Sequence, residues 1–127
     1  MRVLYIDDDR VNIMLFEETC RHAPGAQVAS ASNGEEALEV AREFAPELLI
    51  IDLHLPGITG YELLARLREV PGLGAVPAIL CSAESAADVR PAALGAGFSE
   101  CWEKPVELQT LIARLERLGT AATDPPP

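Results

Sequence analysis

Short apolar runs alternate with stretches of helical periodicity along this sequence, and that alternation limits the fold more than any other feature. The predicted strands lie at 3–6, 27–30, 48–51, 78–81 and 98–103. The helical stripes lie at 11–22, 37–45, 63–67, 86–94 and 108–118. Because strands that alternate with helices pair in parallel, we predict an α/β domain with a parallel sheet and helices on both faces.

The composition of individual runs places the strands within the sheet. The run at 48–51 is apolar throughout, which is typical of a parallel strand covered on both faces. The runs at 27–30 and 98–103 contain more polar or small residues. We therefore expect these two strands at the edges of the sheet.

Local signals predict where elements begin and end. Ser32 and Glu35 are spaced as a helix-capping box. Pro91 lacks a backbone N–H inside a helical stripe, so we expect that helix to be shortened or kinked. No apolar stripe follows residue 118, which predicts one domain over 1–118 and a disordered tail over 119–127. The starting Met and this tail favour a complete, stand-alone chain.

Charge and composition exclude several classes of function. The formal net charge of −10 opposes binding to nucleic acid and to anionic membranes. No signal-peptide pattern is present, and no apolar run approaches the roughly 20 residues of a membrane span. Cys20, Cys81 and Cys101 lack metal-ligand spacing, so we expect free thiols. The sequence thus predicts a cytoplasmic protein with neither a nucleic acid nor a membrane as partner.

Polar residues follow four of the five predicted strands. Ligands of such sheets bind at the carboxyl ends of the strands. The residues at these ends are Asp7, Asp8, Asp9, Asp52, Ser82, Lys104 and Pro105. Each alone is an ordinary turn or cap residue, and the combination is what indicates a functional site.

The chemistry of this combination favours phosphoryl transfer. Clustered carboxylates repel one another unless a cation lies between them, and oxygen ligands suit Mg²⁺. A carboxylate such as Asp52 can attack phosphorus and form an acyl phosphate. Mg²⁺ and Lys104 would neutralise the charge of the phosphoryl group. The hydroxyl of Ser82 would bond a phosphoryl oxygen only after transfer, which could drive a conformational change.

Four segments, in this order, make the chain resemble the receiver domains of two-component response regulators. They are VLYIDDD at 3–9, LIIDLHLPGITG at 49–60, PAILCSA at 77–83 and EKP at 103–105. The resemblance covers about residues 2–118. It implies a flavodoxin-like fold, with a five-stranded parallel sheet of order 2-1-3-4-5 flanked by five helices.

The resemblance also implies a role for each matching residue. Asp52 matches the phosphoacceptor, and Ser82 matches the switch hydroxyl. Lys104 matches the family's lysine, and Pro105 matches the proline after it, which often follows a cis bond.

The implied metal ligands come from three strand ends. Asp7 and Asp8 match the acidic pair, with Asp8 as the more direct Mg²⁺ ligand. Asp52 and the backbone carbonyl of His54 match the remaining protein ligands. No metal contact is assigned to Asp9.

The chain departs from the family pattern at the position of an aromatic switch. Cys101 stands where the family has Tyr or Phe, so an aromatic swing at that position is excluded. Trp102 is next to it, and its replacement of the missing aromatic is left open. Strand alternation directs Trp102 to the opposite face, where we interpret it as a packed or interface aromatic. His54 and Glu84 occupy positions that tune dephosphorylation in the family. The simpler interpretation of His54 is a histidine at the rim with only its carbonyl used.

The resemblance predicts partners rather than a separate substrate. A sensor histidine kinase or a histidine phosphotransfer protein would dock on the first helix, around Val11, Asn12 and Met14, and on the loop after Lys104. An unknown downstream protein would bind the face of the fourth helix, fifth strand and fifth helix, and a homodimer through that face is a further option. We expect no enzyme beyond self-catalysed phosphoryl transfer and autodephosphorylation.

Two alternatives remain open. Residues 4–11 also fit the start of a haloacid-dehalogenase-like phosphatase, in which Asp7 would be the nucleophile and Asp9 the acid and base. That family needs a further acidic motif and a cap domain, which the sequence does not provide. The second alternative is a pseudo-receiver that acts without phosphorylation. Mutation of Asp52 distinguishes the phosphatase from a receiver domain, because such a phosphatase would still be labelled at Asp7.

Overall fold

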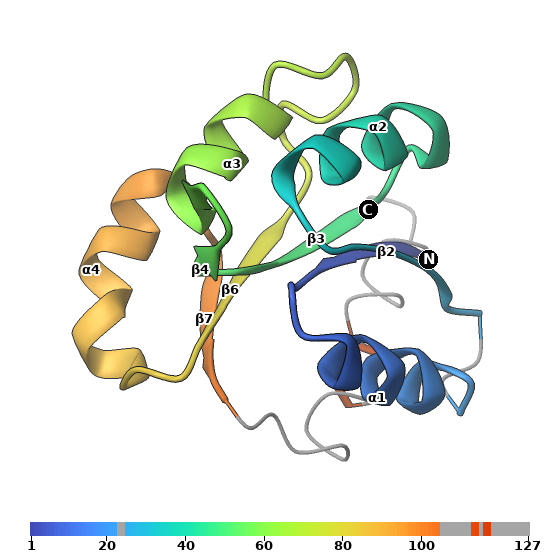
Figure 1. The fold of residues 1–127 in the computed structure, drawn as a ribbon, viewed down its shortest axis with the longest axis horizontal. Coiled ribbons are helices and arrows are strands. Elements are labelled where there is room, and N and C mark those ends of the chain that lie inside the picture. Colours follow the sequence, from blue (N-terminus) through green and yellow to red (C-terminus); the bar gives the residue numbers. More distant parts are fainter. Residues whose placement is uncertain (23–24, 105–112, 115, 118–127) are drawn as a thin grey trace, which may run out of the picture.

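Five parallel strands form the central sheet of the computed structural model (Figure 1). The structure describes residues 1–22, 25–104, 113–114 and 116–117. The strands are β1 (Arg2–Ile6), β2 (Gln27–Ala31), β3 (Leu48–Asp52), β6 (Ala78–Ser82) and β7 (Glu100–Glu103). Their order is β2-β1-β3-β6-β7. This order confirms the predicted 2-1-3-4-5 arrangement. It also confirms that the two more polar strands, β2 and β7, lie at the edges of the sheet.

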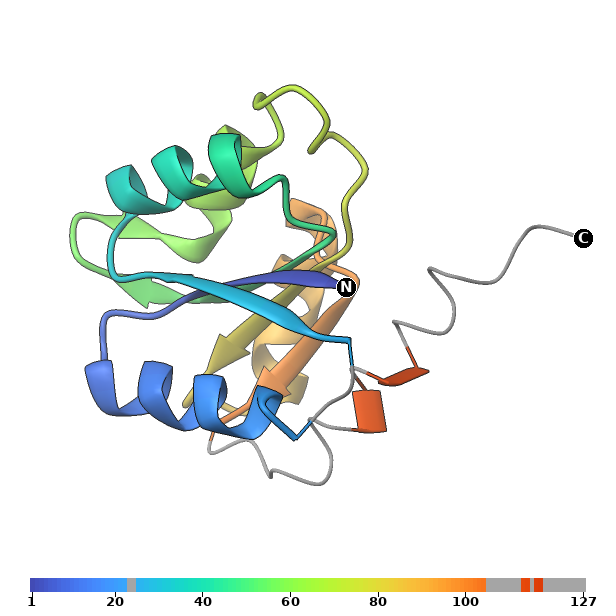
Figure 2. The ribbon, with the colours of Figure 1, turned by 90° about the vertical axis from the view of Figure 1, so that its right-hand side faces the viewer.

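Helices cover both faces of the sheet, which makes three layers in Figure 2. One face packs against α1 (Arg10–Cys20). The other packs against α2 (Gly34–Phe44), α3 (Gly60–Leu67) and α4 (Ala86–Ala96). Residues 113–114 and 116–117 are helical, but most of the fifth helix predicted at 108–118 lies outside the described residues. Pro105 and the predicted tail at 119–127 also lie outside them.

The alternation of side chains along each strand builds two separate cores. Leu4 and Ile6 point into the core shared with α2, α3 and α4, while Val3 and Tyr5 point into the core under α1. All five residues of β3 are buried, as predicted for a strand covered on both faces. Burial of each Leu or Ile side chain contributes about 1.5–3 kcal/mol to the stability of the fold. This burial keeps the strands paired, and the pairing fixes where their carboxyl ends lie.

One local prediction was wrong, and a second was wrong in part. The helix at 34–44 is capped by Asn33, whose side chain accepts from the N–H of Glu36 at 2.9 Å, and not by Ser32. β2 continues to Ala31, which moves the start of the helix one residue later than the capping pattern indicated. α4 continues past Pro91 to Ala96, so the predicted shortening does not occur; Pro91 is exposed, and buried residues lie on both sides of it. The kink that was expected as the alternative stays a prediction.

The strands β4 (His54–Leu55) and β5 (Ile58–Thr59) form an antiparallel hairpin that the sequence did not predict. The three cysteines are buried and free, as expected. Within the described residues, no helix has the length and hydropathy needed to cross a bilayer.

Candidate functional site

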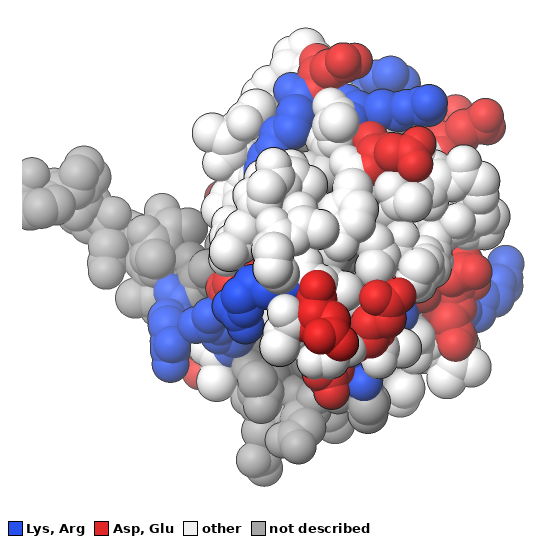
Figure 3. Space-filling model, turned by 90° about the vertical axis from the view of Figure 1, so that its left-hand side faces the viewer, with Lys and Arg blue, Asp and Glu red and all other residues white. Residues whose placement is uncertain are grey.

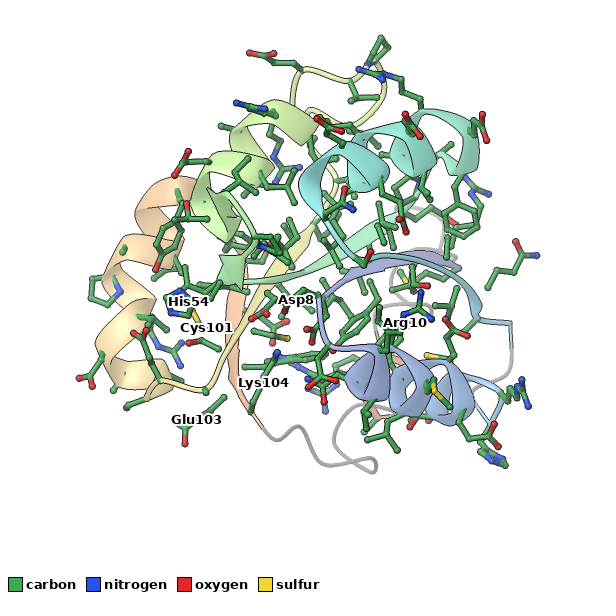
Figure 4. The ribbon with its side chains drawn as sticks, viewed as in Figure 1. Asp8, Arg10, His54, Cys101, Glu103 and Lys104 are labelled. Carbon is green, nitrogen blue, oxygen red and sulfur yellow. The ribbon has the colours of Figure 1, made fainter. Side chains whose placement is uncertain are left out.

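Four neighbouring strands deliver polar side chains to one edge of the sheet. Matched parallel register sets this arrangement, since Ile6 pairs with Ile51 and Ser82 pairs with Glu103. The residues that directly follow or end these strands therefore meet, as predicted. Figure 4 shows Asp8 and Lys104 reaching this edge from the ends of β1 and β7.

Asp7 lies deepest in the site, with 1% of its surface exposed. Its Oδ2 atom accepts hydrogen bonds from the Tyr5 hydroxyl at 2.9 Å, from Asn12 Nδ2 at 3.2 Å and from Lys104 Nζ at 2.9 Å. Its Oδ1 atom accepts from the backbone N–H of Asp9 at 3.0 Å. A buried carboxylate is stable only with such partners, and Asp7 has them from three elements.

Lys104 joins the two buried carboxylates. Its Nζ atom lies 2.9 Å from Asp7 Oδ2 and 3.3 Å from Asp52 Oδ1. Burial alone would lower the pKa of Lys104, but the hydrogen bonds and charges of Asp7 and Asp52 raise it above its ordinary value. The lysine is therefore a permanent cation at physiological pH. It is also the only lysine of the sequence.

The two buried carboxylates have opposite pKa shifts. Burial opposes the charge of Asp7, but hydrogen bonds from Lys104, the Asp9 amide and Tyr5 outweigh it and lower the pKa of Asp7. Burial is also the largest influence on Asp52, and together with the charge of Asp7 it raises the pKa of Asp52 despite Lys104. Asp52 is thus the less stabilised and more reactive anion of the two.

The acidic residues are close enough to share a cation. One carboxylate oxygen each from Asp7, Asp8 and Asp52 lies within 4.8 Å of the others. Asp8 is exposed, so the group opens to solvent. A few hard oxygen donors with room for water fit Mg²⁺ or Mn²⁺. The residues present therefore fit the predicted metal, while the ligand role of the His54 carbonyl stays a prediction.

Ser82 is buried at the end of β6, next to Asp52 in the sheet order. Its Oγ atom accepts a hydrogen bond from the N–H of Glu84 at 3.0 Å. Its backbone carbonyl accepts from the N–H of Lys104 at 2.7 Å. The hydroxyl therefore bonds the β6–α4 loop, and it must rotate about the Cα–Cβ bond of Ser82 before it can bond another group.

His54 and Glu84 form a contact that the sequence did not predict. His54 Nε2 lies 2.8 Å from Glu84 Oε1, and both side chains are exposed. The contact links the β4–β5 hairpin to the β6–α4 loop at the rim of the site. Each residue lies two positions after a strand end, and β3 and β6 are neighbours, which is the signal that could have suggested it.

Cys101 and Trp102 lie on opposite faces of β7, as strand alternation predicted. Cys101 is buried in the core shared with α3 and α4. Trp102 packs against the α1 core, and its Nε1–H donates to Glu100 at 3.3 Å. The packed-aromatic interpretation of Trp102 agrees with this position.

Three contacts near the site were not predicted from the sequence. Tyr5 and Asn12 bond Asp7, as described above. Glu103 accepts a hydrogen bond from the N–H of Ala86 at 3.0 Å and so supplies the cap that the side chain of Ser85 does not give to α4. The spacing of Tyr5 and Asp7, two residues apart on one strand face, is the signal for the first of these contacts.

Known proteins resemble this chain in sequence and in fold. The sequence matches the family described as Response regulator receiver domain over residues 3–116. The virulence sensor protein BvgS of Bordetella pertussis is 37% identical over 133 residues, which cover 100% of this chain and 11% of BvgS. The transcriptional regulatory protein PrrA of Mycobacterium tuberculosis is 36% identical over 126 residues, which cover 96% of this chain and 53% of PrrA. The chain thus spans a small part of one relative and about half of the other.

A solved structure with a similar fold is the receiver domain of a sensor histidine kinase from Pseudomonas aeruginosa. Its TM-score is 0.78 and its identity is 26%, over 91% of this chain and 94% of that chain. That structure is described as having a magnesium ion coordinated in its active site cleft.

Proposed function

The chain belongs to the response regulator receiver domain family, and on this premise we propose that it is a signalling switch phosphorylated on Asp52. The observation that carries the proposal is the meeting of three carboxylates and the only lysine at one sheet edge. Asp52 is the carboxylate with a raised pKa, and its Oδ1 atom already contacts Lys104. These are the features of a nucleophile beside a cation.

In the proposed reaction, a carboxylate oxygen of Asp52 attacks the phosphorus of a phosphohistidine. The new P–O bond forms as the P–N bond breaks, and the imidazole nitrogen leaves with the electron pair. The product on this chain is an acyl phosphate. Lys104 turns from Asp52 toward the transferred phosphoryl oxygens and balances their charge.

The metal proposal rests on the donor set. Asp7, Asp8 and Asp52 would hold Mg²⁺, with the carbonyl of His54 as a further ligand. When bound, the ion supplies positive charge that offsets the phosphoryl oxygens. The magnesium ion of the Pseudomonas aeruginosa receiver domain supports this assignment.

The proposed output begins at Ser82. Its hydroxyl would leave the N–H of Glu84 and donate to a phosphoryl oxygen, which releases a backbone contact of the β6–α4 loop. The contact between His54 and Glu84 lies at the rim of the site and would control the access of water to the acyl phosphate. The change would thus reach the face around α4.

Two surfaces are proposed for the partners. A histidine kinase or phosphotransfer protein would dock beside α1, where Val11, Met14 and Leu15 are 62%, 68% and 58% exposed. The downstream protein, or a second copy of the chain, would bind near α4, where Figure 3 shows a broad uncharged surface and Leu94 is 52% exposed. The relatives that are named as a sensor and as a transcriptional regulator fit such a signalling role. The cytoplasmic location remains part of this proposal.

Intact-mass measurement after incubation with acetyl phosphate and Mg²⁺ tests the phosphorylation proposal. We expect one added phosphoryl group in the wild type and none in Asp52→Asn. Labelling that persists at Asp7 in the variant would support the phosphatase alternative. Absence of labelling, together with absence of any spectral change with beryllofluoride and Mg²⁺, would support the pseudo-receiver and overturn the proposal.

A further inference from the structure

Tyr5 lies against Asp7, the most buried carboxylate of the site. We propose that Tyr5 is a positioning residue that fixes which oxygen of Asp7 faces the metal. The juxtaposition that supports this is a stacked, buried phenol whose hydroxyl bonds Asp7 Oδ2. The inference rests on the proposed function, because the metal in question is the one used in phosphorylation.

The ring of Tyr5 is held in place by packing. It stacks on Phe16 with a centroid separation of 4.2 Å and an angle of 7° between the planes. Tyr5 and Phe16 are 7% and 5% exposed. A ring fixed between a strand and α1 can hold its hydroxyl at one point, and that point is 2.9 Å from Asp7 Oδ2.

The two oxygens of Asp7 have different numbers of partners. Oδ2 accepts from Tyr5, Asn12 and Lys104, whereas within the described residues Oδ1 accepts only from the N–H of Asp9. A carboxylate offers about four lone-pair sites over its two oxygens. Oδ2 is therefore saturated, and the free lone pair is on Oδ1. Tyr5 and Asn12 thus leave Oδ1 as the oxygen available to a metal.

The hydroxyl matters most when Lys104 moves. Lys104 gives one of the three bonds to Oδ2, and in the proposed reaction it turns toward the phosphoryl group. Without Tyr5 and Asn12, Asp7 would then keep only the bond from the N–H of Asp9, and its carboxylate could rotate about the Cα–Cβ and Cβ–Cγ bonds. Groups that bond a metal ligand in this way orient it, and their loss commonly weakens metal binding by about 10–100-fold.

The test uses Tyr5→Phe, which removes the hydroxyl and keeps the stacked ring. Calorimetric titration with Mg²⁺ and with Mn²⁺ should show dissociation constants raised about 10-fold. In the acetyl phosphate reaction, the half-saturating Mg²⁺ concentration should rise by the same factor. The rate at saturating Mg²⁺ should change by less than about twofold, because the nucleophile is untouched.

Tyr61→Phe is the matched control. It removes a phenol hydroxyl from α3, outside the group that bonds Asp7, so its metal dissociation constants should stay those of the wild type. Asn12→Ala removes the second donor to the same oxygen and should also weaken metal binding, which keeps the test decisive if Tyr5→Phe folds poorly. Urea unfolding of each variant measures any general loss of stability.

The possible results separate this inference from the proposed function. Unchanged or tighter metal binding in both Tyr5→Phe and Asn12→Ala would overturn the inference. So would an equal effect in Tyr61→Phe. If the wild type binds Mg²⁺ and Tyr5→Phe weakens it, but no phosphoryl group appears on Asp52, the inference stands and the proposed function fails. A wild type that binds neither metal overturns both.

Discussion

Replacement of Lys104 by Met should expose how much of the stability of the site depends on one cation. Lys104 Nζ lies 2.9 Å from Asp7 Oδ2 and 3.3 Å from Asp52 Oδ1. The variant keeps the length of the side chain but leaves two buried carboxylates facing each other without a positive charge. Because Lys104 is the only lysine of the sequence, no other lysine can take its place between the two carboxylates.

The distances set the size of the effect. With an effective dielectric constant of about 20, charges at 2.9 Å and 3.3 Å attract by about 6 and about 5 kcal/mol. The desolvation of the lysine offsets part of this, and either carboxylate can take up a proton in the variant. Breaking a buried pair typically costs about 3–5 kcal/mol. The Lys104 side chain is 20% exposed, so we expect a loss of about 3 kcal/mol at pH 7 without metal.

The pH dependence follows from the directions of the pKa shifts. The pKa of Asp7 lies below its ordinary value of 3.8, so its contribution is present above that pH and is lost as the pH falls through the lowered pKa. The pKa of Lys104 lies above its ordinary value of 10.5, so its contribution is present below that pH and is lost as the pH rises through the raised pKa. The difference between wild type and Lys104→Met should therefore be largest between these limits.

Urea unfolding followed by Trp102 fluorescence measures this difference, with EDTA present to remove metal. Arg21→Met is the control, because Arg21 pairs with Glu18 at 3.0 Å on the exposed surface and should cost less than about 1 kcal/mol. Added Mg²⁺ should restore part of the stability of Lys104→Met. A loss below about 1 kcal/mol, or a loss that stays constant from pH 3 to pH 8, would refute the reasoning.

Three further changes test other parts of the structure. Asp52→Asn should raise the free energy of unfolding at pH 7 without metal, because the raised pKa of Asp52 means that its charge destabilises the folded state. Urea titration should show that this gain vanishes as the pH falls below 3.8, where the carboxyl is protonated in both states. Gly60→Ala should cost about 1–3 kcal/mol, because its Cβ would lie 2.7 Å from the Asp52 carbonyl oxygen, whereas Gly74→Ala has nothing within 4 Å and should be near neutral in the same assay. Glu103→Ala should cost about 1 kcal/mol and speed amide exchange at the start of α4, and an unchanged exchange rate there would contradict the capping role.

The sheet was predictable because burial leaves a direct pattern in the sequence. A strand such as 48–51, apolar at every position, can be stable only between two layers of helices. Features that depend on a single turn left weaker patterns. The start of α2 moved by one residue because Asn33 competes with Ser32 as a cap, and α4 tolerated Pro91 because one missing N–H costs less than the burial of Val89 and Ala93 contributes.

The candidate site was predictable only in its innermost layer. Parallel strands in register bring their carboxyl ends to one edge, so residues after four apolar runs must meet there. The contacts around that layer depend on rotamers and on loop paths. The Tyr5 hydroxyl, the His54–Glu84 contact and the Glu103 cap each join groups whose spacing along the chain gives no strong periodic signal.

The absence of an aromatic residue at Cys101 limits how the site can communicate with α4. The thiol is small and buried, and the ring of Trp102 lies on the opposite face of β7. In the described part of the chain, three hydrogen bonds join the site and its rim to residues 84–86: those of Ser82 and His54 with Glu84, and that of Glu103 with the N–H of Ala86. Rotation of Ser82 would break its bond to the N–H of Glu84, and a movement of residues 84–86 that follows would strain the bond between Ala86 and Glu103. We therefore expect the signal to travel through the backbone of 82–86, and not through an aromatic side chain of β7.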